Sequence, residues 1–174
     1  MAKKMSFRTI LSEKRMDQVI KAITGNDTDS DDTRPDISMV FSADPDHEKV
    51  DVVIVELKRR TQSDRDNTYV YTQLANRAQK LADYCPNIQR MWYYGVIDIN
   101  PELSRTLRTM RWTPLFSRGS VFYFEFNAER KDGTSVPAPT CLLDFDALIK
   151  DAAARNHTFL EILKSGFKRA KGKV

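Results

Sequence analysis

The chain has 174 residues, of which 41% are hydrophobic, and it contains only six glycines and seven prolines. This composition fits one globular domain with a sizeable core and excludes a disordered or fibrous protein. The 28 basic and 24 acidic residues give a net charge of +4, which favours an acidic partner such as nucleic acid without the one-sided charge of a histone-like protein.

The two cysteines, Cys85 and Cys141, lie far apart and belong to no Cys-x-x-Cys or Cys/His cluster. The sequence therefore predicts neither a disulfide framework nor a structural zinc site, and it fits a reducing cytoplasm. No apolar run reaches the roughly 18 residues of a membrane span. We expect a soluble, cytoplasmic protein without a membrane partner, since no apolar signal core follows the first residues.

The first predicted element is a helix over residues 11–24. Apolar side chains recur there at close to helical spacing, Ser12 is placed to cap the start, and Gly25 is placed to end it. Residues 26–33 contain no apolar side chain, which predicts a solvated loop before the first strand.

Two β-type runs follow, at residues 37–43 and 50–57, and the polar segment between them predicts an antiparallel hairpin. Residues 52–55 of the second run are apolar on both faces, which is typical of a central strand covered on both sides. A register in which paired residue numbers sum to 92 would set Asp36 across from Glu56. A slip of one residue would send Asp36 to the other face, and the sequence leaves this choice open.

A second helix is predicted over residues 67–84. Its apolar stripe consists of Val70, Leu74, Ala78 and Leu81. A polar and basic stripe lies beside it, made of Gln73, Arg77 and Lys80.

The rest of the chain predicts a strand at 91–99, a short helix from 101 towards 110, a strand at 121–126, a turn at 131–133, an extended segment at 136–139, and an amphipathic helix at 145–164 broken near Asn156. The predicted order of elements is therefore α, β, β, α, β, short α, β, α. A basic tail ends the chain, so we assign residues 145–174 to a C-terminal helix and tail.

The chemistry of the chain centres on Asp36, Glu56 and Lys58. Strand side chains alternate between faces, so Glu56 and Lys58 project from the same side of the sheet. Two carboxylates suit Mg²⁺ or Mn²⁺, and a nearby lysine can orient or deprotonate an attacking water or stabilise a negative transition state. The competing interpretation is an ordinary exposed ion pair at a strand end.

Pro35-Asp36, Glu56-Leu57-Lys58 and the following helix with Gln73 resemble the PD-(D/E)xK nuclease superfamily. The resemblance implies an α/β (α+β) fold with a restriction-endonuclease-like core, in which a mixed central β-sheet is flanked by helices. It covers residues 12–99 of a single domain that we expect to span residues 1–174.

The resemblance also implies the roles of individual residues. Four side chains would be catalytic, namely Asp36, Glu56, Lys58 and Gln73. Mg²⁺ or Mn²⁺ would be held by Asp36, Glu56, the backbone carbonyl of Leu57 and Glu13, the last placed on the first helix. Nucleic-acid contacts would come from Arg59, Arg60, Arg77 and Lys80.

The function implied is that of an Mg²⁺- or Mn²⁺-dependent deoxyribonuclease acting in restriction, repair or defence against foreign DNA. Its partners would be DNA and either a second copy in a homodimer or a larger multidomain assembly. Two alternatives stay open: a non-catalytic nucleic-acid-binding or scaffolding module of the same fold, and an unrelated α/β protein in which the motif is coincidental.

Overall fold

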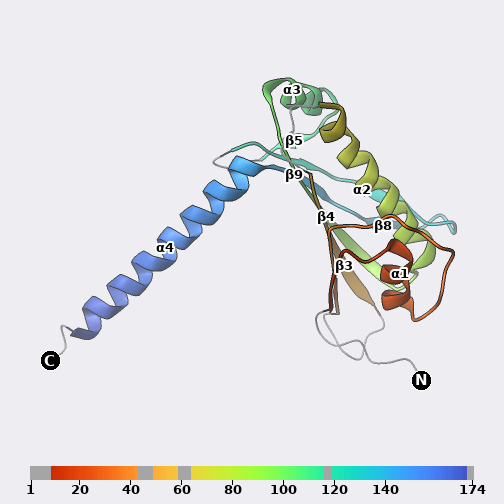
Figure 1. The fold of residues 1–174 in the computed structure, drawn as a ribbon, viewed down its shortest axis with the longest axis horizontal. Helices are drawn as coiled ribbons and strands as arrows, with labels where there is room; N and C mark the ends of the chain where they lie inside the picture. Colours follow the sequence, from red (N-terminus) through yellow and green to blue (C-terminus); the bar gives the residue numbers. More distant parts are fainter. Residues whose placement is uncertain (1–8, 43–48, 59–63, 116–118, 172–174) are drawn as a thin grey trace.

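The computed structural model describes residues 9–42, 49–58, 64–115 and 119–171 (Figure 1). It has a mixed α/β fold. The main sheet holds, in spatial order, β1 (Thr9–Ser12), β2 (Ile37–Phe41), β3 (Val50–Leu57), β4 (Ile88–Ile97), β9 (Thr140–Asp144), β6 (Val121–Phe124) and β5 (Thr113–Pro114). A small second sheet pairs β7 (Asn127–Glu129) with β8 (Ser135–Pro137). The described residues also form four helices: α1 (Met16–Thr24), α2 (Asp64–Tyr84), α3 (Pro101–Thr109) and α4 (Phe145–Lys171).

The main sheet mixes both strand directions. The pairs β1–β2, β2–β3, β9–β6 and β6–β5 are antiparallel, whereas the pairs β3–β4 and β4–β9 are parallel. Helix α2 makes the crossover that a parallel β3–β4 pair requires. The expectation of a mixed central sheet with helices is confirmed at this level.

The pairing of β2 with β3 settles the register that the sequence left open. Ile37 pairs with Val55 and Phe41 with Asp51, so paired residue numbers sum to 92. Asp36 directly precedes β2, and this register, continued by one residue beyond the last pair Ile37–Val55, places it opposite Glu56 at the end of β3.

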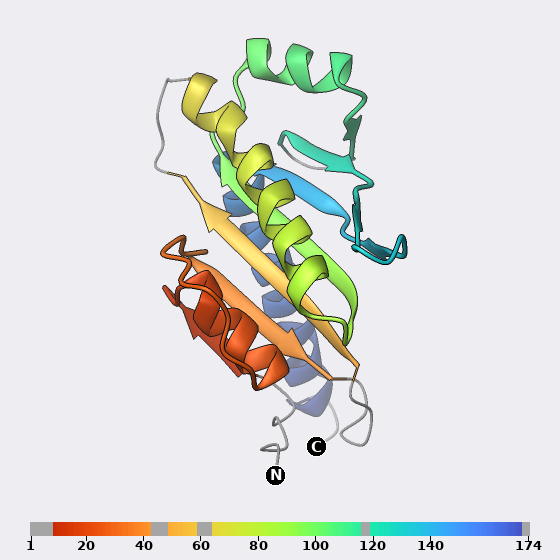
Figure 2. The same cartoon turned by 90° about the vertical axis from the view of Figure 1, so that its right-hand side faces the viewer.

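One face of the main sheet, which we call the core face, is covered by α1 and α2 (Figure 2). The β3 side chains on this face, Val50, Val52 and Ile54, are buried, and so is the whole predicted stripe of α2: Val70, Leu74, Ala78 and Leu81. Gly95 of β4 admits the helix closely, because a Cβ there would lie 2.8 Å from Val70 Cγ1. The α2 prediction is therefore confirmed.

The opposite face, which we call the outer face, is not covered in the same way. Val53 and Val55 of β3 are only half-buried there, and Trp92 of β4 is 38% exposed. The expectation that β3 is covered on both faces is wrong. The run is apolar on both faces because the outward-facing Val53 and Val55 are apolar although they are not fully covered.

Helix α4 begins beside the outer face and leaves the sheet (Figure 1). The Asp144 carboxylate fixes its base by accepting hydrogen bonds from the backbone N–H groups of Asp146, at 2.8 Å, and of Ile99, at 2.9 Å. Ala147 packs so tightly on Gly119 that a Cβ at that glycine would lie 2.7 Å from it. The helix is continuous to Lys171, so the break predicted near Asn156 and the end near residue 164 are wrong.

The predicted first helix is partly wrong. Residues 9–12 are strand β1, whose Leu11 pairs with Ser38, and the helix starts only at Met16. Its predicted end is confirmed, because Gly25 adopts a left-handed φ of 78° and donates its N–H to Lys21 O. Strands β5, β7 and β9 were not predicted, whereas β8 overlaps the extended segment predicted at 136–139. No described helix is long and apolar enough to cross a membrane.

Candidate active site

The candidate site lies where β3 ends and β2 begins, beneath α2. Glu56 continues the buried side of β3 after Val52 and Ile54, and it is only 4% exposed. A carboxylate at such a position must have partners, because an isolated buried charge is very costly.

Two cations supply those partners. Lys58 Nζ donates to Glu56 Oε1 at 2.8 Å, and Arg77 Nη1 donates to Glu56 Oε2. The second nitrogen of Arg77, Nη2, donates to the backbone oxygen of Arg34 at 3.0 Å. Glu56 thus lies between the cation of Lys58, just after the end of β3, and that of Arg77 on α2. Arg77 also connects this cluster to the segment that leads into β2.

Asp36 is held beside this cluster through the backbone. Its Oδ2 accepts a hydrogen bond from the N–H of Leu57 at 2.6 Å. Its own carbonyl oxygen accepts from the N–H of Glu13 at 3.2 Å. The carboxylate therefore has a fixed direction, and the two acids predicted as metal ligands lie at one edge of the sheet.

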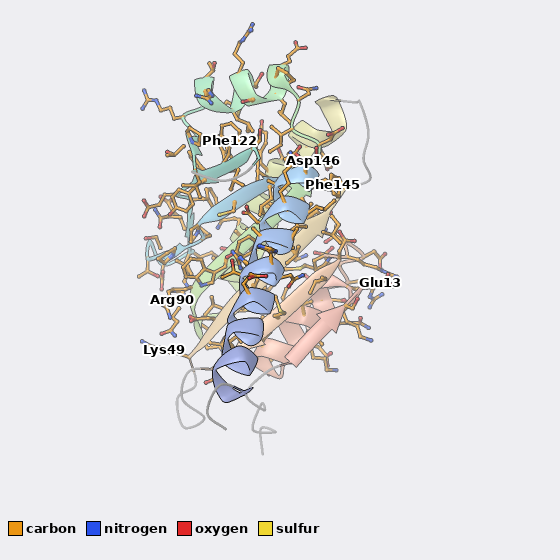
Figure 3. All side chains as sticks on the ribbon, turned by 90° about the vertical axis from the view of Figure 1, so that its left-hand side faces the viewer. Glu13, Lys49, Arg90, Phe122, Phe145 and Asp146 are labelled. Atoms are coloured by element: carbon orange, nitrogen blue, oxygen red, sulfur yellow. The ribbon has the colours of Figure 1, made fainter. Side chains whose placement is uncertain are left out.

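Glu13 is placed differently from the prediction. It lies in the turn between β1 and α1, at a left-handed φ of 53°, and not on a helix. Its side chain is exposed at the β1 edge of the sheet (Figure 3). The contact of Glu13 with Asp36 is made by its backbone N–H alone.

The donor atoms suit a hard divalent cation only in part. Carboxylate and carbonyl oxygens are the ligands of Mg²⁺, and Asp36, Glu56 and the Leu57 carbonyl supply them. Yet both oxygens of Glu56 already face cations, and the described residues contain no group of three or more His, Cys, Asp or Glu side chains placed to hold a metal. A metal at this edge would have to take one Glu56 oxygen from Lys58 or Arg77.

A cavity of about 170 Å³ opens between α1 and α2 next to this cluster. Tyr69, Gln73, Arg77 and Lys80 of α2 contribute to its lining. The Oε1 atom of Gln73 is buried and has no hydrogen-bond partner among the described residues. This atom is an unsatisfied acceptor inside the protein, next to the cavity that the Gln73 side chain helps to line.

The predicted nucleic-acid contacts divide into two groups. Arg59 and Arg60 lie outside the described residues. Arg77 is 7% exposed and its guanidinium is used inside the protein, so it does not form part of an open basic stripe.

Lys80 forms an ion pair with Asp31 across the cavity rim. Burial alone raises the pKa of the Asp31 carboxyl, but hydrogen bonds from Lys80 and Thr33 outweigh it, so the pKa lies below the ordinary 3.8. Lys80 is therefore tied to the protein, although its side chain stays partly exposed.

The role of Arg77 was missed by the sequence analysis, although a signal was present. Arg77 lies one helical turn after Gln73 and directly before the buried Ala78, which brings its side chain to the margin of the core face. A basic residue at that margin is suited to pair with an acid at the end of a neighbouring strand. The part played by the Arg34 carbonyl left no signal, because any residue has one.

Comparisons of the chain with protein-family models, with curated proteins and with solved structures find no match. The case for a function therefore depends on the geometry around Asp36, Glu56, Lys58 and Arg77.

Proposed function

We propose that this chain is a divalent-metal-dependent nuclease that hydrolyses phosphodiester bonds in DNA, built on a restriction-endonuclease-like core. The observation that carries the proposal is the pairing of β2 with β3, whose register sets Asp36 opposite Glu56, while the Lys58 ammonium lies 2.8 Å from Glu56 Oε1. Two acids and a lysine that converge on one sheet edge are what metal-assisted phosphodiester hydrolysis requires.

The order of elements gives further support. Helix α1, the antiparallel pair β2–β3, the crossover helix α2 and the parallel strand β4 follow one another as the resemblance to the PD-(D/E)xK superfamily implies. The acids stand at the carboxyl end of β3, and ligands of α/β sheets commonly bind outside the carboxyl ends of parallel strands.

The metal would be held by the carboxylates of Asp36 and Glu56 and by the Leu57 carbonyl. When bound, Mg²⁺ or Mn²⁺ supplies a water of lowered pKa and neutralises charge on the phosphate oxygens. Lys58 is the cation that leaves Glu56 in this scheme, because its side chain is 23% exposed whereas that of Arg77 is 8% exposed.

The chain's own residues then have distinct tasks. The N–H of Leu57 holds the Asp36 carboxylate in place, and Arg77 holds Glu56 while it is tethered to Arg34 O. Lys58, once released, orients the attacking water or stabilises the negative phosphate oxygens. The Gln73 side chain, which lines the cavity together with Arg77, contacts the bound substrate or its water.

A cleavage assay with supercoiled, linear and single-stranded DNA, and with RNA, tests the proposal. We expect wild type to cut DNA with Mg²⁺ or Mn²⁺ and to stop with EDTA, and we expect Asp36→Asn and Lys58→Met each to lower the rate about 100-fold or more. Asp51→Asn is the matched control, because Asp51 is an acid on the opposite face of the same strand, paired with Arg90. The proposal fails if wild type cuts no nucleic acid, or if Asp36→Asn cuts as fast as wild type.

A second candidate is a nucleic-acid-binding or scaffolding module of the same fold without cleavage. The Arg77–Glu56 ion pair favours it, because it compensates the buried carboxylate without a metal. Titration calorimetry with Mn²⁺ separates the two candidates. A nuclease binds the ion and loses that binding in Asp36→Asn, whereas the module gives no metal-binding heat and still retains DNA in a gel-shift assay.

A further inference from the structure

The described residues leave the outer face of the main sheet partly open, and most of its side chains are apolar, apart from the Asp51–Arg90 ion pair. Its side chains include Met39, Phe41, Val53, Val55, Trp92 and Tyr94, which come from β2, β3 and β4. They are half-buried or exposed, and Leu57 at the end of β3 is 46% exposed. A hollow of about 360 Å³ is lined by Phe41, Val53, Trp92 and Tyr94, with Asp51 as its one charged residue. Exposed apolar patches of this kind mark sites of association.

Helix α4 carries a second exposed apolar surface. Leu148 is 44% exposed and Ile149 is 63% exposed. Between residues 147 and 158 of the same helix, the shielded positions are Ala147, Asp151 and Ala154, which recur at helical spacing on another side. Leu148 and Ile149 therefore point away from the body of their own subunit.

The helix cannot cover the outer face of its own chain while its base keeps the observed contacts. The hydrogen bonds of Asp144 and the Ala147–Gly119 contact set the direction of α4. The helix lies in front of the sheet in Figure 3, but Figure 1 shows that it diverges from the sheet along its length. From these observations we propose that the outer face is a dimer interface, covered by α4 of a second copy of this chain.

The geometry of a reciprocal exchange suits both surfaces. Each copy offers one outer face and one projecting helix, so a two-fold axis satisfies both copies with the same contacts and closes the assembly. A 27-residue helix is about 40 Å long and about 10 Å wide. Two exchanged helices and the faces beneath them would bury about 1,600 Å², which is the size of a standard stable interface.

The proposal is independent of nuclease activity and is tested by oligomeric state. We expect wild type to elute as a dimer by size-exclusion chromatography with light scattering. Ile149→Asp should raise the dimer dissociation constant by at least about 30-fold, because it puts a charge into an apolar contact. Thr158→Asp introduces the same charge one turn after the shielded Ala154 and should leave the dimer intact.

The second half of the test asks what the helix covers. Val53→Lys on the outer face should also dissociate the dimer. The chain has two tryptophans, and Trp112 is buried, so iodide quenching of fluorescence reports mainly on Trp92. Quenching should be weak in the wild-type dimer and several-fold stronger in Ile149→Asp, and this comparison decides the matter even if Val53→Lys misfolds.

Three results would overturn the proposal. Wild type could be monomeric; Thr158→Asp could dissociate the dimer as strongly as Ile149→Asp; or Trp92 could stay equally accessible to iodide in dimer and monomer. The last result would mean that the helices associate with each other and not with the sheet.

Discussion

The two faces of the main sheet are built from the same strands but differ in burial and in the role that we propose for each. On β3, Val52 and Ile54 are fully buried on the core face, whereas Val53 and Val55 are half-buried on the outer face. The core face ends in the buried charge of Glu56, while the outer face leaves apolar side chains in water. Charged side chains are usually exposed and large apolar ones usually buried, so the buried Glu56 and the apolar outer face are both unusual. We locate the chemistry at Glu56 and the association at the outer face.

The largest effect is expected from removing the charge of Glu56. Glu56→Gln should lower the free energy of unfolding by about 3 kcal/mol, because it leaves Arg77 buried without a counter-charge. Urea denaturation measures the loss. The double variant Glu56→Leu/Arg77→Met should recover most of it, since apolar groups of similar size replace both charges. A double variant no more stable than the single would show that the ion pair is not the cause.

A matched pair of substitutions compares the faces directly. Val52→Ala should cost about 2 kcal/mol, because it leaves a cavity under α1 and α2. Val53→Ala, the same change one residue later, should cost less than about 1 kcal/mol when measured by urea denaturation of the Ile149→Asp variant, which we expect to be monomeric. Equal costs would mean that the outer face is as well packed as the core face. A larger cost of Val53→Ala in the chain with Ile149 intact would indicate that the dimer covers it.

The core face was predictable from the sequence, and the outer face was not. The α2 stripe of Val70, Leu74, Ala78 and Leu81 follows helical periodicity, and β3 was placed at its observed bounds because β-branched residues fill it. The antiparallel pairing of β2 with β3 could be predicted from the polar segment that joins two β-type runs. Only its register needed the structure, because both registers are compatible with apolar runs.

The failures have a common physical cause. An apolar run on both faces does not show whether a helix of the same chain packs on each face. The sequence therefore predicted that β3 is covered on both faces, whereas α1 and α2 cover only the core face. β1 and β9 owe their strand state to neighbours distant in sequence, as in the pairing of Leu11 with Ser38. The Arg77–Glu56 ion pair likewise joins residues 21 positions apart, and only the packing of α2 brings them together.

Cys85 gives a pH-dependent test of how well the core face is buried. Burial raises the pKa of Cys85 under the core face to about 12, against 9.0 for an ordinary thiol. Above pH 9 the Cys85 thiol ionises in the unfolded chain but not in the folded protein. The free energy of unfolding therefore falls as pH rises, by about 1.4 kcal/mol at pH 10. Cys85→Ala should lose that much less stability than wild type between pH 8 and pH 10. Parallel losses in the two proteins would contradict the raised pKa.

The smallest effect is expected from removing the acid of either of two ion pairs near α1, Asp31–Lys80 and Asp27–Lys21. Asp31 and Lys80 are partly buried and expose 11% and 29% of their side chains, whereas Asp27 and Lys21 expose 82% and 56%. Asp31→Asn should cost about 1 kcal/mol at pH 7, and Asp27→Asn should cost little, because water screens an exposed pair. The pKa of Asp31 is lowered in the folded state, so its contribution is present above about pH 4 and fades as pH falls further. Wild type and Asp31→Asn should therefore converge in stability towards pH 2, and a difference that persists at pH 2 would assign the loss to packing around the cavity instead of to charge.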